Sequence, residues 1–194
     1  AGADFRFANL DNVNFTNADL TGADFSSATI INSDFTGADL INIYAATVRI
    51  KDNFFHNTNL SGAFLVGAEI LCAVLQEYDS QRLLEMPSKH DCINNTNFEN
   101  ANLSQTRLFN LDFSNSKVEN TKFTMASVTK SIFPQEINAD FSGSTLPATQ
   151  FRGDLSNVIF SCHELWCTDF STRVFGGNLV SATDLSYTDL SKRD

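Results

Sequence analysis

A period of five residues is the feature that most constrains the fold of this chain. When the first 75 residues are divided into fives, the fifth residue is large and apolar from Phe5 to Leu75, with Ala45 as the exception. Two positions earlier the residue is usually small, as at Ala3, and Asp or Asn usually lies between the two. Neither the 3.6-residue period of a helix nor the two-residue period of a flat strand fits this pattern. The period predicts a chain that turns a corner every five residues, with the large and small residues inward and the residue between them outward.

Four such segments close a square coil of about 20 residues, and successive coils should stack at a strand spacing of about 4.8 Å. The chain has 18 Phe against one Trp and three Tyr, so one aromatic shape is selected repeatedly. Large residues one coil apart then form rows, with Phe on two opposite faces and aliphatic residues on the other two. Each buried member of these rows stabilises the fold by about 1.5–3 kcal/mol before entropy is counted. The predicted core ladder comprises Phe5, Phe15, Phe25, Phe35, Phe55, Leu10, Ile30, Ile50, Ile70, Leu20, Leu40 and Leu60.

The repeat is interrupted at residues 76–95, where YDSQRLLEM could form a short helix that Pro87 would end. It returns in a new phase at Phe98, slips again at residues 134–138, and regains its first phase after a one-residue deletion near RGDL. We expect a single domain over residues 1–194 with about eight coils. It would be regular over 1–75, carry an insertion at 76–95 and continue with less regular repeats over 96–190.

The segments TNADL, TGADF, TGADL and ENANL match the A(D/N)LXX shorthand of the pentapeptide-repeat family almost as written. The chain resembles this family over most of its length. The resemblance implies an all-β fold, a right-handed quadrilateral parallel β-helix, with the large residue and the small one two places before it facing the interior.

The formal net charge is −10 and the sequence pI is near 4.6, which disfavours direct binding to nucleic-acid phosphates. The acidity is uneven. Residues 1–40 carry six Asp against Arg6 alone, whereas residues 96–133 carry one more Lys or Arg than Asp and Glu. No apolar run of about 18 residues exists, so no membrane span is expected.

Candidates for chemistry are few. The one Cys/His cluster is Cys162, His163 and Cys167, but His163 falls at an inward position that suits neither a metal ligand nor a base. We therefore predict no catalytic residue, no metal site and no cofactor. Cys72 and Cys92 flank the interruption, and we interpret them as separate buried thiols, with a disulfide in an oxidising compartment as the alternative.

The interruption is the candidate recognition element, because loops on a rigid scaffold often carry binding. Its alternative interpretation is a tolerated bulge. The residues expected to contact a partner there are Tyr78, Arg82, Glu85, Lys89 and His90.

The resemblance implies a non-enzymatic scaffold that binds a protein partner of unknown identity, either free-standing or as a domain of a larger bacterial protein such as a secreted effector. Dimerisation through an end of the β-helix is a further expectation. A cytoplasmic or secreted location is favoured over a membrane. The alternative function, also implied by the family, is an acidic imitation of DNA that binds a type II topoisomerase and gives quinolone resistance.

Overall fold

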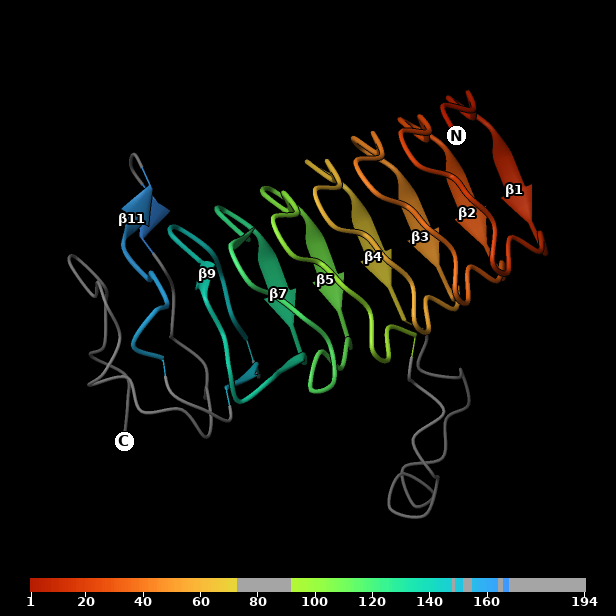
Figure 1. The fold of residues 1–194 in the computed structure, drawn as a ribbon. Coiled ribbons are helices and arrows are strands. Elements are labelled where there is room, and N and C mark those ends of the chain that lie inside the picture. Colours follow the sequence, from red (N-terminus) through yellow and green to blue (C-terminus); the bar gives the residue numbers. More distant parts are fainter. Residues whose placement is uncertain (73–91, 148, 152–154, 164–165, 168–194) are drawn as a thin grey trace, which may run out of the picture.

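The protein is a right-handed, four-sided parallel β-solenoid (Figure 1). The computed structural model describes residues 1–72, 92–147, 149–151, 155–163 and 166–167, and these residues contain strands and turns but no helix. Figure 1 shows the coils stacked side by side along one axis, beginning with β1 near the N-terminus.

The strands are short because each occupies one side of a coil. They are β1 (Asn9–Asp11), β2 (Thr29–Ile31), β3 (Arg49–Lys51), β4 (Glu69–Leu71), β5 (Arg107–Phe109), β6 (Thr121–Lys122), β7 (Ser127–Thr129), β8 (Ile132–Phe133), β9 (Ala139–Asp140), β10 (Gln150–Phe151), β11 (Cys162–His163) and β12 (Trp166–Cys167). The longest sheet is parallel and has the order β1-β2-β3-β4-β5-β7. β6 pairs with β9 and β8 with β10, also in parallel, whereas β11 and β12 are antiparallel.

The four faces are named here after the first inward residue on each. The Leu10 face carries the six-stranded sheet, in which Leu10, Ile30, Ile50, Ile70, Leu108 and Val128 are in register. The Phe5 face continues through Phe25, Ala45, Leu65, Leu103, Phe123, Phe141 and Phe160. The Phe15 face continues through Phe35, Phe55, Ile93, Phe113, Phe133 and Phe151, and the Leu20 face through Leu40, Leu60, Phe98, Val118, Ile137 and Leu155.

Phenylalanine rings fill the interior from two opposite faces. On the Phe15 face, Phe15, Phe35 and Phe55 stack with ring centroids 4.9 and 5.0 Å apart. On the Phe5 face, Phe5 and Phe25 stack at 4.7 Å, and Phe5 meets Phe15 edge to face at 5.6 Å. Stacking along each row and edge contacts between the rows together use both favourable aromatic geometries.

Each corner is made by a residue in the left-handed backbone region, two positions after the inward residue. Asn and Gly recur there, as at Asn12 (φ 54°) and Gly22 (φ 66°). Both residue types tolerate this conformation better than others do, which explains why they repeat with the same period of five.

The Phe5 row is interrupted at Ala45, and the neighbouring inward position compensates. Ile43 occupies the position that is normally small, and both Ile43 and Ala45 are buried. The exchange of large and small residues leaves only a small cavity of about 20 Å³ among the surrounding core side chains.

The interruption leaves the stack continuous. Ile70 on β4 pairs directly with Leu108 on β5, so the sheet passes the insertion without a gap. Cys72 and Cys92 form a disulfide with their Cα atoms 6.1 Å apart, so the interpretation of separate thiols is wrong. The physical reason is that the chain leaves and rejoins the stack at one corner, which brings the two residues within disulfide range.

The slip at residues 134–138 has a simple origin. Ile137 follows Phe133 by four residues, and Phe141 follows Ile137 by four, so two adjacent sides of this coil are one residue short. Phe151 and Leu155, both buried, are also four apart, which accounts for the return to the first phase.

About eight coils are expected over the whole chain, and the longest sheet of the described residues has six strands. The expectation counted residues 168–194, which lie outside the described part, as does the short helix expected within 78–86. Among the described residues, no helix is long and apolar enough to cross a membrane.

Candidate protein-interaction surface

The residue immediately before each inward residue points outward, and these residues form the outward rows of the solenoid. Asp and Asn recur there because their side chains hold the corner that follows. The backbone N–H of Thr36 donates to Asp34 Oδ1 at 2.8 Å, and that of Ser114 donates to Asp112 Oδ1 at 2.9 Å. This is the Asx-turn arrangement. The repeated carboxylates therefore support the backbone and need no catalytic explanation.

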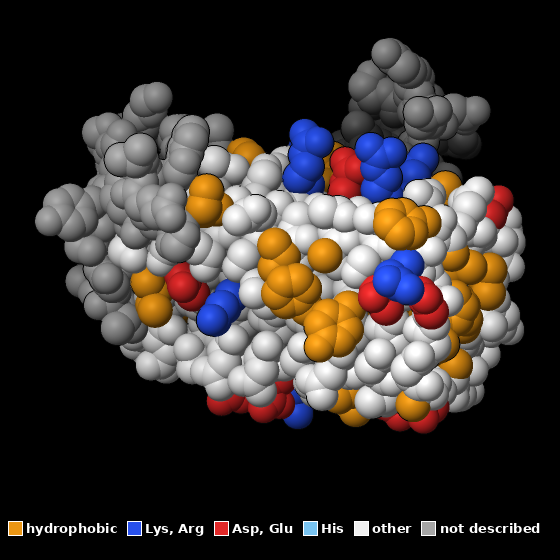
Figure 2. Space-filling model, turned by 90° about the horizontal axis from the view of Figure 1, so that it is seen from above, with side chains coloured by type: hydrophobic (Ala, Val, Ile, Leu, Met, Phe, Trp, Pro, Cys, Tyr) orange, Lys and Arg blue, Asp and Glu red, His pale blue; other side chains and the backbone are white. Residues whose placement is uncertain are grey.

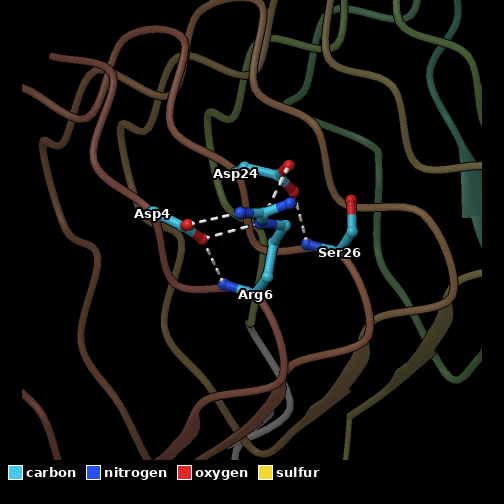
Figure 3. Close-up of polar contacts among 4 residues, drawn as sticks. All are labelled: Asp4, Arg6, Asp24 and Ser26. Atoms are coloured by element: carbon cyan, nitrogen blue, oxygen red, sulfur yellow. Dashed lines mark hydrogen bonds and ion pairs between the residues drawn. The ribbon is translucent and has the colours of Figure 1, made fainter.

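One outward row begins with a charged cluster. Asp4 and Asp24 lie one coil apart, and Arg6 lies between them (Figure 3). Arg6 donates to both carboxylate oxygens of Asp4, at 3.0 and 2.7 Å, and its Nε lies 3.9 Å from Asp24 Oδ2. These hydrogen bonds lower the pKa of Asp4 to about 2. Arg6 therefore offsets part of the negative charge on this row.

The same row turns aromatic in the next two coils. Asp24 is followed by Tyr44, and Tyr44 by Phe64, with the two ring centroids 6.5 Å apart. Tyr44 is 58% exposed and Phe64 41% exposed. Half-buried Ala46 and Val66 lie beside them, one position beyond the inward residues. We call Tyr44, Ala46, Phe64 and Val66 the aromatic patch, and Figure 2 shows hydrophobic side chains gathered on the middle of this side of the molecule.

Two further phenylalanines are exposed, away from the aromatic patch. Phe54 lies in the outward row of the Phe15 face, where its ring meets His56 edge to face at 5.9 Å, and it is 47% exposed. Phe7 is a corner residue of the first coil with φ 60°. The aromatic patch is thus the one place where two exposed aromatic rings adjoin in the described coils.

The sequence pattern contained the signal for this patch. Tyr44, Phe54 and Phe64 occupy the position that the repeat fills with Asp or Asn, and the pattern already marks that position as outward. A large aromatic residue there is a departure from the repeat on the exposed surface. The sequence-based prediction placed recognition in the interruption and did not consider this row.

The residues proposed from the interruption, Tyr78, Arg82, Glu85, Lys89 and His90, lie outside the described residues. The core-ladder residues lie inside. Phe5, Leu10 and Phe15 in the first coil are half-buried, because that coil has a neighbour on one side only, and the other nine are buried: Leu20, Phe25, Ile30, Phe35, Leu40, Ile50, Phe55, Leu60 and Ile70.

Cys162, His163 and Cys167 fall on the antiparallel pair β11 and β12, where the structure describes the backbone alone. Over the coils whose side chains are described, no three His, Cys, Asp or Glu residues come together as metal ligands would.

A polar hollow of about 1020 Å³ lies beside the shortened coil. Five amide side chains line it, and the charged residues of the lining are Lys117, Glu119 and Glu136. The amides are those of Asn95, Asn115, Gln135, Asn138 and Asn157. Several of these amides donate to Asn side chains outside the lining, as Asn138 Nδ2 does to Asn120 Oδ1 at 3.2 Å and Asn115 Nδ2 to Asn94 Oδ1 at 3.2 Å. The hollow lies beside the coil in which two adjacent sides are each one residue short.

The fold and its outward rows define the class: a β-solenoid built from five-residue sides. A family model described as pentapeptide repeats matches eight copies in the chain, over residues 1–37 and 93–124. Over those residues the chain carries the repeats that define the pentapeptide-repeat family.

Solved structures of other proteins are similar to this chain. A trypsin-treated form of QnrB1, a plasmid-mediated fluoroquinolone resistance protein, aligns over 92% of this chain and 85% of its own, with 19% identity and a TM-score of 0.52. HetL from the cyanobacterium Nostoc sp. strain PCC 7120, a pentapeptide repeat protein involved in heterocyst differentiation regulation, aligns over 94% and 86%, with 16% identity and a TM-score of 0.39. At such identities the similarity to QnrB1 shows the fold alone. No curated protein sequence matches the chain.

Proposed function

We propose that this protein is a non-enzymatic interaction scaffold that binds a protein partner through the aromatic patch. The observation that supports the proposal is the exposure of Tyr44 and Phe64 side by side in an outward row. In the described coils, the large apolar residues at inward positions are buried or half-buried, so these two rings are not needed to fill the core.

Aromatic side chains suit this role for physical reasons. They bury a large area at a low cost in conformational entropy, and Tyr adds a hydroxyl that can bond to a partner. The patch lies on parallel coils joined by continuous backbone hydrogen bonds, such as Leu65 N–H to Asn102 O at 2.8 Å. A surface held this firmly loses little freedom on binding, which favours affinity.

Photo-crosslinking tests the proposal. A photoreactive phenylalanine replaces Phe64 in the aromatic patch, or the exposed Lys117 on the Leu20 face as the control, and the proteins are irradiated in the source cell extract. We expect a discrete adduct from position 64 alone, suppressed by excess unlabelled wild-type protein but not by the Tyr44→Ala/Phe64→Ala variant. Equal suppression by both competitors would show that the aromatic patch is not part of the binding surface.

The second candidate is an acidic imitation of DNA directed at a type II topoisomerase. The first two coils favour it, because Asp4 with Asp24 and Asp19 with Asp39 line two outward rows at the coil spacing. The third coil disfavours it, because these rows continue with Tyr44 and Asn59. A supercoiling assay with gyrase decides between the two: we expect no inhibition at micromolar protein, and inhibition would favour DNA imitation.

Three expectations from the sequence remain proposals beside this one. The insertion at 76–95 would add its residues to the recognition surface, the repeats would form one domain over 1–194, and the solenoid would dimerise through an end. Deletion of residues 76–90 tests the first expectation, because the photo-crosslinked adduct should weaken if the insertion contacts the partner. Sedimentation of the same protein tests the third, because a dimer formed through an end should persist without the insertion.

A further inference from the structure

Positive charge gathers on one face of this acidic protein. Arg49 and Lys51 flank the inward Ile50 on β3, Arg107 lies on β5, and Lys130 follows β7 directly. All four belong to the Leu10 face or its edge, next to the Phe5 face that carries the aromatic patch. We call them the basic strip. Figure 2 shows Lys and Arg side chains gathered around an acidic side chain along one edge of that view.

The carboxylates of this region compensate the basic strip in part. Glu69 lies between Arg49 and Arg107 in the sheet register, at 3.7 Å from Arg49 Nε and 3.8 Å from Arg107 Nη1. Lys51 Nζ lies 3.9 Å from Asp52 Oδ2. Four cations against two carboxylates leave an excess of two positive charges on the Leu10 face between β3 and Lys130.

The two arginines keep capacity for a further anion. Both contacts to Glu69 are longer than a hydrogen bond, and Arg49 is 75% and Arg107 77% exposed. The arginines lie two strand spacings apart, about 10 Å. A carboxylate placed above each guanidinium could accept two parallel N–H bonds, which is the geometry that guanidinium groups favour.

Apolar surface accompanies this charge. Leu71 and Phe109 lie side by side in the row next to the arginines, and both are half-buried. Lys130 Nζ lies 5.5 Å from the centre of the Phe109 ring. The Leu10 face therefore offers guanidinium groups for carboxylates and, beside them, a site for one apolar side chain.

We infer that the basic strip docks an acidic segment of a partner protein, with carboxylates on Arg49 and Arg107 and an apolar side chain on Leu71 and Phe109. A long polyanion such as DNA fits less well, because it would extend from the strip over the acidic outward rows of the first two coils. Screening over about 8–10 Å in physiological salt separates the strip from those rows, so a short acidic segment experiences the local positive charge.

The binding of a short fluorescein-labelled peptide, rich in glutamate and carrying two leucines, tests this inference by fluorescence anisotropy. We expect Arg49→Gln/Arg107→Gln to weaken binding about tenfold, since it removes both guanidinium partners. The control Lys117→Gln/Lys122→Gln removes the same charge from two other faces and should leave binding within about twofold. A third variant, Lys51→Gln/Lys130→Gln, leaves the Glu69 contacts in place and should also weaken binding.

Circular dichroism establishes that each variant is folded before binding is measured. Absence of peptide binding, or equal weakening by the strip and control variants, would overturn the inference. So would equally tight binding of an oligothymidylate of matched charge, which would make the surface a general anion site. Salt-sensitive self-association of the wild-type protein that Arg49→Gln/Arg107→Gln abolishes would instead make a second copy the occupant.

Discussion

At the scale of single residues, the residue at each corner determines how much backbone strain that corner carries. The left-handed conformation suits Asn and Gly, but the chain also places Ser27 and Thr47 there, at φ 61° and 56°. A β-branched residue in this region is strained. The Thr47 hydroxyl makes two hydrogen bonds that offset part of this strain, to Ala46 O at 2.7 Å and with Ser27 Oγ at 3.0 Å.

Replacing Thr47 with Asn should stabilise the protein. The new side chain tolerates the left-handed region, so part of the backbone strain is relieved, and we expect a gain of about 0.5–1 kcal/mol in the free energy of unfolding. Urea unfolding measures it. The same change at Thr29, which lies in strand β2, should give no gain, and equal effects at the two sites would mean that the corner conformation is not the cause.

The ion pair of the first coil makes a prediction about titration. The hydrogen bonds from Arg6 lower the pKa of Asp4 to about 2, so the midpoint of the Asp4 titration measured by NMR should lie near that pH. The variant Arg6→Gln should raise the pKa of Asp4 toward its ordinary value of 3.8. A lowered carboxyl pKa stabilises the folded state above the ordinary pKa, and this contribution is lost as the pH falls from about 4 toward 2. An unchanged Asp4 titration in Arg6→Gln would show that the Arg6 side chain does not cause the lowered pKa.

At the scale of the coil side, the interior tolerates an exchange of positions as long as the volume is conserved. Ile43 and Ala45 carry their large and small side chains in the reverse order from the rest of the Phe5 face, and both are buried. The period of five predicted which positions face inward. It could not predict this exchange, because packing fixes the sum of the two volumes and leaves their order open.

A double-mutant cycle tests the exchange. Ile43→Ala alone should cost about 2–4 kcal/mol by opening a cavity, and Ala45→Leu alone should cost about 1–3 kcal/mol by overpacking. The double variant restores the usual order of the repeat and should recover more than half of the summed loss. Simple additivity in urea unfolding would show that the two side chains do not share one space.

At the scale of the whole molecule, the stack continues through an interruption because the chain leaves and returns at one corner. The Cys72–Cys92 disulfide closes that corner, while Ile70 and Leu108 pair beside it. The solenoid therefore carries an inserted segment without losing the register of its sheet.

Reduction of this disulfide should destabilise the protein. The bond closes a loop of about 20 residues in the unfolded chain, and releasing it should lower the free energy of unfolding by about 2–4 kcal/mol. Thermal unfolding with and without a reductant measures the effect, and Cys72→Ser/Cys92→Ser serves as the control that should not respond to the reductant at this bond. Identical melts of the wild-type protein in both conditions would contradict the assigned role.

The sequence allowed most of the fold to be predicted, because inward positions obey one period and one size rule. It predicted less of the surface. Outward residues such as Tyr44 and Arg49 pack against little, so the fold does not determine them and the repeat carries no rule for them. The Cys72–Cys92 bond was only the alternative interpretation for a related reason, since spacing along the chain does not reveal that these two residues meet at one corner.

The central claim of this account is a division between inward rows, which hold the fold, and the aromatic patch, which is free to bind. Urea unfolding of Tyr44→Ala/Phe64→Ala beside Phe35→Ala tests it most directly. We predict a loss of at most about 1 kcal/mol for the patch variant, the value of a cross-strand pair, and about 3–5 kcal/mol for Phe35→Ala, which empties a core site. Comparable losses in the two variants would contradict the claim, because Tyr44 and Phe64 would then serve the fold.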